Sequence, residues 1–274
     1  MNRLYVDSRT RVFGTASNFA IELPEDIVVR EESYAIVDRI AIPHSWYLIS
    51  ERNNRFYFLE DIDRTRLYRT LFLEPGNYDI DLLTAELQRL MNNGRLVANP
   101  YTVSYNTSLK LIQVTNDWQA GEYCYVPTER SLIDFGDLVL WEVDPTNLRG
   151  VFAQIGMLTG PTVFGGDGFG ATPITLNSSP MLRDPQTQLF IKGNLGAPGT
   201  SFGHCGQDIL RRVPVTVPKN AVIYDEMLTQ YNKVRISPGS YSTLWFQLVG
   251  YDGNEVDLNG CDWSFFVAIF GAEE

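Results

Sequence analysis

Residues suited to acid–base or nucleophilic chemistry are few in this chain, since His44 and His204 are its only histidines. His204 precedes Cys205, and an imidazole beside a thiol is a pairing that nucleophilic catalysis uses. Adjacent side chains on an extended chain point in opposite directions, however, so these two would not meet. His44 follows Pro43 in an apolar and aromatic run, where a hydrogen-bonded structural histidine is more common than a general base. The sequence therefore indicates a protein that is not an enzyme, and it assigns no catalytic residue.

Carboxylates gather in two stretches, residues 60–63 and residues 252–257, and they offer the oxygen ligands that calcium prefers. Neither stretch has the spacing of the twelve-residue calcium loop that makes such an assignment specific. Asp and Asn beside glycine commonly form turns instead. We therefore expect no metal site.

The glycine-rich segment 165–170 invites comparison with loops that bind phosphate groups. It lacks the preceding parallel strand, the following helix and the Lys-Ser/Thr pair of such loops. We predict an exposed loop here, with Asp167 and Phe169 as candidates for contact with a partner. No cofactor is expected.

The formal net charge of −11, from 33 acidic and 22 basic side chains, argues against a protein that coats nucleic acid, because that task needs Lys and Arg to neutralise phosphates. No segment approaches the roughly 18 to 20 apolar residues of a membrane span, and residues 1–5 lead into polar sequence rather than a signal-peptide core. Synthesis in the cytosol is the resulting expectation. Cys124, Cys205 and Cys261 are odd in number and widely spaced, which favours reduced thiols, although the sequence leaves open that two of them approach in space.

Strands dominate the elements that the sequence predicts. The C-terminal stretch 242–270 contains two runs with a period of two, 243–248 and 263–269, and residues such as Gly253 and Gly260 allow the chain to reverse between them. Because the second run is apolar on both faces, we expect it to lie centrally in a sheet, paired on both sides. Other short strands at regular spacing along the chain are typical of a sandwich or barrel.

One helix is predicted over about 79–92, where apolar residues recur at helical spacing and an aspartate can cap the start. Its single apolar stripe places it on the surface of the sandwich. Residues 116–204 are rich in Gly and Pro turns apart from a strand at 188–192, which indicates exposed loops or an insertion. The predicted organisation is an all-β sandwich domain over 17–274 in which 116–204 is a loop-rich insertion.

Residues 1–16 precede the first clear strand and are predicted to form a polar N-terminal arm. Such an arm either packs on a neighbouring subunit or lies along its own sheet, and we expect packing on a neighbour. Four of its side chains are the candidates for this subunit contact: Arg3, Tyr5, Arg9 and Arg11.

Several short segments, taken together, resemble one protein family. They are Leu4-Tyr5-Val6-Asp7-Ser8-Arg9, Gly14-Thr15, Asn18-Phe19, Ile42-Pro43-His44-Ser45-Trp46, Pro75-Gly76-Asn77-Tyr78, Leu210-Arg211-Arg212-Val213-Pro214-Val215, Gly253-Asn254, Val256-Asp257-Leu258-Asn259-Gly260 and Trp263-Ser264-Phe265. In combination they resemble the single jelly-roll penton (minor capsid) proteins of polinton-like viruses, virophages and related adintoviruses. The resemblance covers about 1–115 and 207–271 and leaves the middle of the chain uncovered.

This resemblance implies a single jelly roll of two antiparallel sheets. It also implies a homopentamer that occupies each five-fold vertex of an icosahedral DNA-virus capsid and contacts the major capsid protein, so the protein would reside in the virion after synthesis in the host cytoplasm. The uncovered middle could then face outwards and contact a host receptor. The alternative is a β-sandwich that binds glycans as a host-attachment spike, with Trp118 and Trp141 as candidates for a sugar site, and a hydrolase is the least supported hypothesis.

Overall fold

The computed structural model describes residues 2–62, 65–108, 111–117, 122–126, 162–165, 174–175, 186–196, 208–226 and 232–271. The chain divides into two compact units, one formed by Met1–Trp46 with Gln186–Glu274 and the other by Tyr47–Pro185. We call the first the sandwich unit. The second is called the inserted unit, because it lies in sequence between the two parts of the first.

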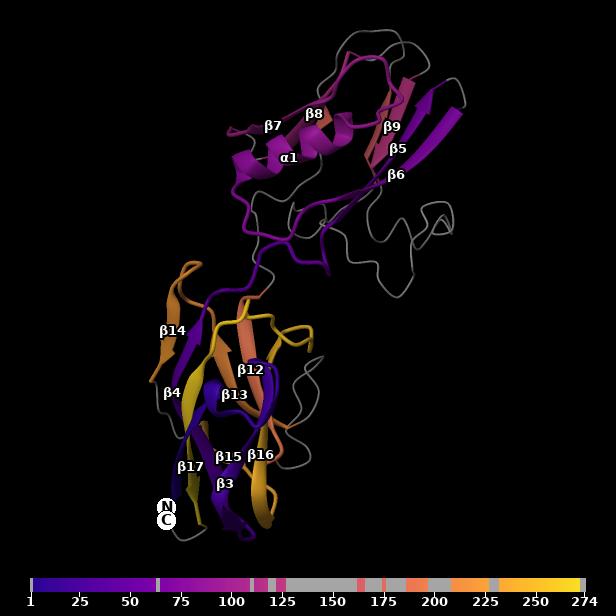
Figure 1. The fold of residues 1–274 in the computed structure, drawn as a ribbon. Helices are drawn as coiled ribbons and strands as arrows, with labels where there is room; N and C mark the ends of the chain where they lie inside the picture. Colours follow the sequence, from indigo (N-terminus) through magenta and orange to yellow (C-terminus); the bar gives the residue numbers. More distant parts are fainter. Residues whose placement is uncertain are drawn as a thin grey trace. The chain divides into compact units, whose positions relative to one another are not determined.

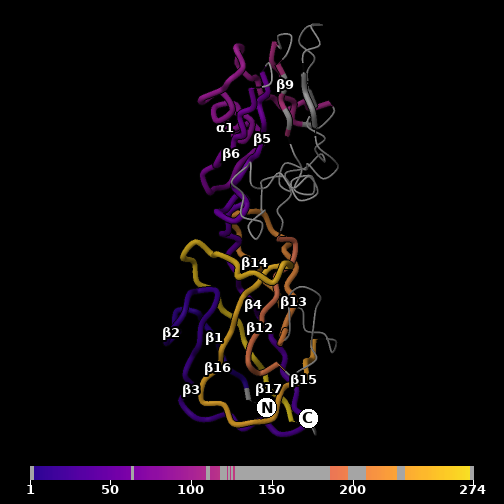
Figure 2. Tube along the Cα trace, turned by 90° about the vertical axis from the view of Figure 1, so that its right-hand side faces the viewer, coloured from indigo at the N-terminus to yellow at the C-terminus, as the bar shows by residue number. Residues whose placement is uncertain are grey.

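Two antiparallel sheets build the sandwich unit (Figures 1 and 2). Sheet 1 has the order β1-β17-β4-β14, with β15 paired to β4, and comprises β1 (Asn2–Asp7), β17 (Ser264–Phe270), β4 (Tyr34–Pro43), β14 (Val222–Asp225) and β15 (Val234–Arg235). Sheet 2 has the order β13-β12-β16-β3-β2 and comprises β13 (Ile209–Pro214), β12 (Gln188–Gly193), β16 (Gly239–Gly250), β3 (Asn18–Val29) and β2 (Phe13–Gly14).

Eight of these strands follow the order of a jelly roll. Taken along the chain, they are β1, β3, β4, β12, β13, β14, β16 and β17. When these eight strands are numbered from one to eight, sheet 1 has the order 1-8-3-6, which is β1-β17-β4-β14. Sheet 2 has the order 2-7-4-5, which is β3-β16-β12-β13. A double-sheet roll of two Greek keys has this arrangement. The expected fold class, an all-β single jelly roll of two antiparallel sheets, is therefore confirmed.

Aromatic rings join the two sheets in the core. Phe246 of sheet 2 meets Phe265 of sheet 1 edge to face, with 5.0 Å between ring centroids and 83° between planes. Trp263 stacks on Phe265 at 4.8 Å and meets Phe19 of β3 at 5.9 Å. All four side chains are buried. Since full burial of a large apolar side chain is worth about 1.5 to 3 kcal/mol, this cluster is a main source of the cohesion between the sheets.

Strand β17 lies between β1 and β4 and is paired on both sides, as its apolar sequence predicted. The segment before it reverses at Gly253, Asn259 and Gly260, whose φ angles are 76°, 51° and 77°. These values lie in the left-handed region that Gly, and to a lesser degree Asn, adopt most cheaply. The predicted reversal of the chain is therefore confirmed.

The N-terminal segment is a strand of the sandwich rather than a projecting arm. Strand β1 pairs with β17 along its whole length, from Asn2 opposite Ile269 to Asp7 opposite Ser264. Val6 is completely buried between the sheets. The predicted arm is therefore corrected to a strand of the chain's own sheet, whose inward side is covered by its own core. Contact of its outward side chains with a neighbouring subunit stays a prediction. After β1 comes a short 3₁₀ helix, Ser8–Thr10.

The inserted unit has sheets and a core of its own. One sheet has the order β10-β9-β5-β6 and comprises β10 (Thr162–Gly165), β9 (Glu122–Val126), β5 (Arg55–Ile62) and β6 (Thr65–Phe72). The other has the order β11-β8-β7 and comprises β11 (Ile174–Thr175), β8 (Leu111–Thr115) and β7 (Thr102–Asn106). Buried residues of β5, β6, β7, β8 and β9 form one cluster with the helix α1 (Ile80–Asn92).

Helix α1 has the predicted bounds, and the Asp79 carboxylate caps it by accepting the Leu82 N–H at 2.8 Å. Its expected place on the sandwich is wrong, since Leu83, Leu87 and Met91 pack into the core of the inserted unit. Periodicity identifies the apolar side of a helix but not the sheet that covers it. Among the described residues, no helix has the length and hydropathy needed to cross a bilayer.

The boundaries of the two units differ from the organisation that the sequence suggested. We expected one domain over 17–274 with its insertion at 116–204, whereas the inserted unit spans Tyr47–Pro185. Strand β12, which falls within the expected insertion, lies in the interior of sheet 2. The difference arises because strands of both units show the same alternation, which does not specify the sheet that a strand joins.

Candidate assembly surface

Aromatic and basic side chains lie together on the outer face of sheet 1. The register of β1 with β17 places Tyr5 opposite Phe266 and Arg3 opposite Ala268. The rings of Tyr5 and Phe266 lie 5.1 Å apart at 49°. The guanidinium carbons of Arg3 and Arg39 lie 4.5 Å and 5.9 Å from the centroid of the Phe266 ring. Both guanidinium groups therefore lie within cation–π distance of the Phe266 ring.

Side-chain alternation explains why this surface points to solvent. Val6, Phe265 and Val267 are completely buried between the sheets, so their neighbours Tyr5 and Phe266 point away from the core. Tyr5 keeps 50% of its surface exposed. The outer face of sheet 1 is therefore aromatic where an outward face is usually polar.

An irregularity in β4 brings Arg39 onto this face. Arg39 has a φ of 46°, which is uncommon for a residue with a side chain, and the register between β17 and β4 shifts between Ser264 and Phe266. Bulges of this kind redirect a side chain. As a result the exposed Arg39 stands beside Asp38, whose carboxylate accepts a hydrogen bond from the Arg3 guanidinium at 3.2 Å.

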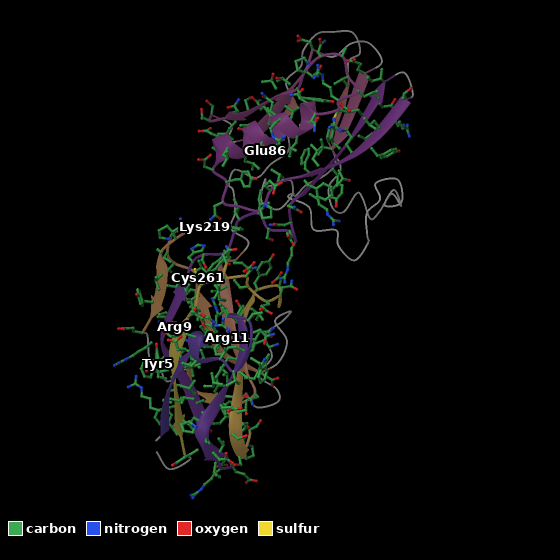
Figure 3. The ribbon with its side chains drawn as sticks, in the orientation of Figure 1. Tyr5, Arg9, Arg11, Glu86, Lys219 and Cys261 are labelled. Atoms are coloured by element: carbon green, nitrogen blue, oxygen red, sulfur yellow. The ribbon has the colours of Figure 1, made fainter. Side chains whose placement is uncertain are left out.

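A second ion pair lies at the end of β1. The Asp7 carboxylate accepts hydrogen bonds from the Tyr5 hydroxyl at 3.1 Å and from the Arg9 guanidinium at 2.5 Å and 2.9 Å. The hydrogen bond from the Arg9 side chain is the largest of the effects that lower the pKa of Asp7 to about 2. Tyr5 and Arg9 are labelled in Figure 3.

Acid is expected to weaken the sandwich unit through this ion pair. The pKa of Asp7 is about 2 in the folded chain, against an ordinary value of 3.8. Folding thus favours the charged carboxylate, so its contribution is complete above about pH 4 and is lost as the pH falls towards 2. Because Arg9 is largely exposed, this contribution should be no more than about 1 kcal/mol. Urea unfolding of the wild type and of Asp7→Asn between about pH 2 and 6 measures this contribution. A difference in unfolding free energy between the two proteins that does not change with pH would contradict the prediction.

Arg11 makes a different set of contacts from the other three candidates. Its guanidinium donates to the Ser8 carbonyl at 2.6 Å and to the Asp262 carboxylate at 2.9 Å. The Ser8 hydroxyl donates to Asp262 at 2.7 Å and accepts the Trp263 N–H at 3.1 Å. These bonds tie the end of the N-terminal segment to the start of β17. The structure therefore brings Arg3, Tyr5 and Arg9 together through Phe266 and Asp7, and Arg11 contacts another part of the unit. Arg11 is also labelled in Figure 3.

Strand β14 extends the exposed apolar surface at the edge of sheet 1. Val222 and Tyr224 are two residues apart, so they point to the same side, and they are 38% and 73% exposed. Tyr224 lies opposite Ala41 of β4. Phe266, Arg39 and Tyr224 were not among the surface residues predicted from the sequence. For Phe266 and Tyr224 the available signal was the alternation itself, which puts aromatic rather than polar residues at outward positions, whereas the exposure of Arg39 depends on the bulge.

His44 has the structural environment that its sequence context predicted. The ring is buried and stacks on Trp46 with 4.2 Å between centroids, and Nδ1 lies 2.9 Å from the Val217 carbonyl oxygen. The His44 main chain also bonds to Ala221 and Asn220. Its imidazole thus fixes the chain at the end of β4.

The acidic loop of the sandwich unit forms turns, as predicted. Asp257 accepts the Asn259 N–H at 2.8 Å, and Asp252 accepts the Asn254 N–H at 3.1 Å. The carboxylate of Glu255 accepts a hydrogen bond from the Thr15 hydroxyl at 2.6 Å. Among the described residues, no three His, Cys, Asp or Glu side chains form a metal-binding group.

Cys124 and Cys261 carry free thiols. Cys124 is buried in the inserted unit, and Cys261 lies partly exposed before β17 (Figure 3). Several other predicted residues lie outside the residues that the structure describes. They are Cys205, His204, Trp118, Trp141 and the exposed-loop candidates Asp167 and Phe169.

Comparison with known proteins gives similarities of structure alone. No protein family model matches the chain, and no curated protein sequence matches it. The mavirus penton protein aligns with 98% of this chain and 99% of its own, at 11% identity and a TM-score of 0.47. A chain of the Sputnik virophage, from its cryo-electron-microscopy structure, aligns with 100% of this chain and 99% of its own, at 10% identity and a TM-score of 0.44.

Proposed function

We propose that this chain is a structural virion protein, the penton that occupies the five-fold vertices of an icosahedral DNA-virus capsid. It acts as a homopentamer, makes contact with the surrounding major capsid protein and catalyses no reaction. Its place is therefore the capsid vertex of the virion. The inserted unit is the part proposed to meet a host receptor.

The observation that carries this proposal is that the segments of the sequence resemblance, apart from Pro75-Gly76-Asn77-Tyr78 in the inserted unit, meet in one jelly roll. Residues 4–9 lie in β1 and the 3₁₀ helix after it, and residues 210–214 lie in β13. The segment 256–265 leads into β17, the central partner of β1. Segments that are more than 240 residues apart in sequence thus meet in the fold, as Ser8 does with Asp262. A resemblance carried by residues that contact each other supports a shared architecture more than scattered matches would.

The outer face of sheet 1 supports a role in assembly. Tyr5, Tyr224 and Val222 expose large apolar surface on one sheet. Exposed apolar surface that is rimmed by charge is typical of protein interaction sites. A surface built on paired strands also keeps its shape when a partner binds, so little ordering entropy is lost.

The mass of the purified chain in solution tests the proposal. Five copies of the 31.0 kDa chain have a mass of about 155 kDa, and light scattering behind a size-exclusion column over a concentration series should reach this plateau. Negative-stain images of the same peak should average to a five-fold ring.

A glycan-binding spike predicts another result in the same measurement. A chain that stays monomeric at all concentrations and retains specific spots on a glycan array would contradict the penton and favour the attachment protein. Added purified major capsid protein provides a second readout, since a penton should shift to the mass of a capsid complex.

A further inference from the structure

Four basic side chains lie on one face of a chain whose formal net charge is −11. Arg3 and Arg39 lie over Phe266 on the outer face of sheet 1. Lys233 lies over the Phe270 ring at 5.7 Å, and Arg235 stands opposite Tyr34 of β4. We call this surface the basic face. Its residues are Arg3, Arg39, Lys233 and Arg235 with the rings of Tyr5, Tyr34, Phe266 and Phe270.

The carboxylates on the basic face are already neutralised within the chain. Asp38 accepts from Arg3, and Asp7 accepts from Arg9. Both carboxylates are largely buried. Arg39, which is exposed, therefore contributes a net positive charge beside the aromatic rings.

A surface of the opposite charge lies on the edge of sheet 2. Residues 22–32 of β3 and the following turn carry five carboxylates and one arginine. We call this surface the acidic edge, and its carboxylates are all exposed: Glu22, Glu25, Asp26, Glu31 and Glu32. Val28 within it is 69% exposed and supplies an apolar centre.

A bulge interrupts the acidic edge. Glu22 lies opposite Thr243 of β16 and Ile27 opposite Tyr241, so residues 23–26 face a single residue of the neighbouring strand. A bulge, a proline and charges on an edge strand all oppose the addition of another strand. A partner would therefore contact this edge through side chains rather than through main-chain pairing.

We infer that the basic face of one copy binds the acidic edge of the next copy in the ring. This inference rests on the proposed pentamer and names the surfaces that build it. The two surfaces belong to different sheets, so their contact is heterologous, which is the type of contact that closes a ring. Charge complementarity around an apolar centre fits both sides, with the half-exposed Tyr5 ring facing Val28.

The same observations favour a second copy of the chain over nucleic acid as the partner of the basic face. Both guanidiniums lie over Phe266, whereas a base-stacking platform presents an open ring. The chain as a whole is acidic, which repels phosphates at long range. An exposed acidic surface of matching character is present on every copy.

Charge reversal on each side tests the inference. Arg39→Glu and Glu25→Lys each change one exposed side chain, and each should raise the concentration at the midpoint of pentamer dissociation about tenfold or more. The double variant carries the swapped pair at every interface and should return to within about threefold of the wild type. Arg212→Glu, an equal charge change at an exposed position of β13, should leave the midpoint unchanged. Sedimentation of all four variants and the wild type in the same buffer gives these midpoints.

Four other results would overturn the inferred contact, and only one of them would also overturn the pentamer. Wild-type pentamers that Arg39→Glu and Glu25→Lys leave unchanged would overturn the inferred surfaces and leave the penton intact. Single variants that dissociate without recovery in the double variant would also overturn the pairing. Loss of binding to a labelled DNA duplex in an intact Arg39→Glu pentamer would show a nucleic-acid surface instead. A wild-type chain that remains monomeric would overturn the pentamer itself, and the inference with it.

Discussion

Trp263→Ala is expected to lower the free energy of unfolding of the sandwich unit by about 3 to 5 kcal/mol. The side chain is 2% exposed, and its ring contacts Phe265 and Phe19 from both sheets. Its indole N–H donates to the Ala16 carbonyl at 2.7 Å. Alanine would leave a cavity between the sheets and an Ala16 carbonyl without its indole donor, and both increase the loss of unfolding free energy.

Urea unfolding followed by far-ultraviolet circular dichroism measures this loss. Phe13→Ala is the matched control, since Phe13 is an aromatic residue of the same unit that is 63% exposed. Phe13→Ala should lower the free energy of unfolding by no more than about 0.5 kcal/mol. A loss below about 1 kcal/mol for Trp263→Ala would mean that this ring does not fill the core.

Arg69→Leu is expected to destabilise the inserted unit by about 3 to 5 kcal/mol, because it removes the cation from a buried ion pair. The Arg69 guanidinium lies 3.4 Å from the Glu60 carboxylate, and the Glu60 side chain is completely buried. Glu60 also accepts hydrogen bonds from the Leu96 N–H at 3.0 Å and the Tyr101 hydroxyl at 2.7 Å. Without Arg69 the buried carboxylate would have no cation beside it in this network.

Arg69 also closes the C-terminal end of helix α1. Its guanidinium donates to the carbonyls of Met91 at 2.8 Å and Leu90 at 3.2 Å, and to that of Asn93. Leu90 and Met91 belong to the last turn and Asn93 is the C-cap, where carbonyls lack the N–H four residues on that partners them elsewhere in a helix. A cation at this position also interacts favourably with the helix dipole. The variant should therefore loosen the last turn of α1 before the rest of the unit.

Hydrogen exchange of the α1 amides, together with thermal unfolding, checks both effects. The control is Arg66→Leu, which removes an arginine of the same strand from an exposed ion pair with Asp61. Exposed pairs contribute about 0 to 1 kcal/mol, so this variant should exchange like the wild type. Equal effects of the two substitutions would contradict a special role of the buried pair.

Part of the candidate assembly surface could be predicted from the sequence. Arg3, Tyr5 and Arg9 were selected as candidates for a subunit contact, and the structure brings them together at β1. That they contact a neighbouring subunit stays a prediction. Arg39 could not be selected, because its exposure depends on a bulge against β17 that lies far away in the chain.

The sequence by itself determined the local elements of this protein. The period of two in 263–269 identified a buried central strand, and the spacing of apolar residues identified helix α1 with its aspartate cap. These patterns are set by neighbours within a few residues, because side-chain direction follows the backbone period. The turns at Gly253 and Gly260 were evident for the same local reason.

Only the tertiary structure decided which strands share a sheet. The pattern of strand β1 alone is compatible with pairing within the chain or between chains, and the register with β17 settled the choice through the burial of Val6. The boundaries of the inserted unit and the core that covers α1 were decided in the same way. Pairing joins residues that are distant in sequence and depends on which apolar faces fit together, a property that no short window of sequence contains.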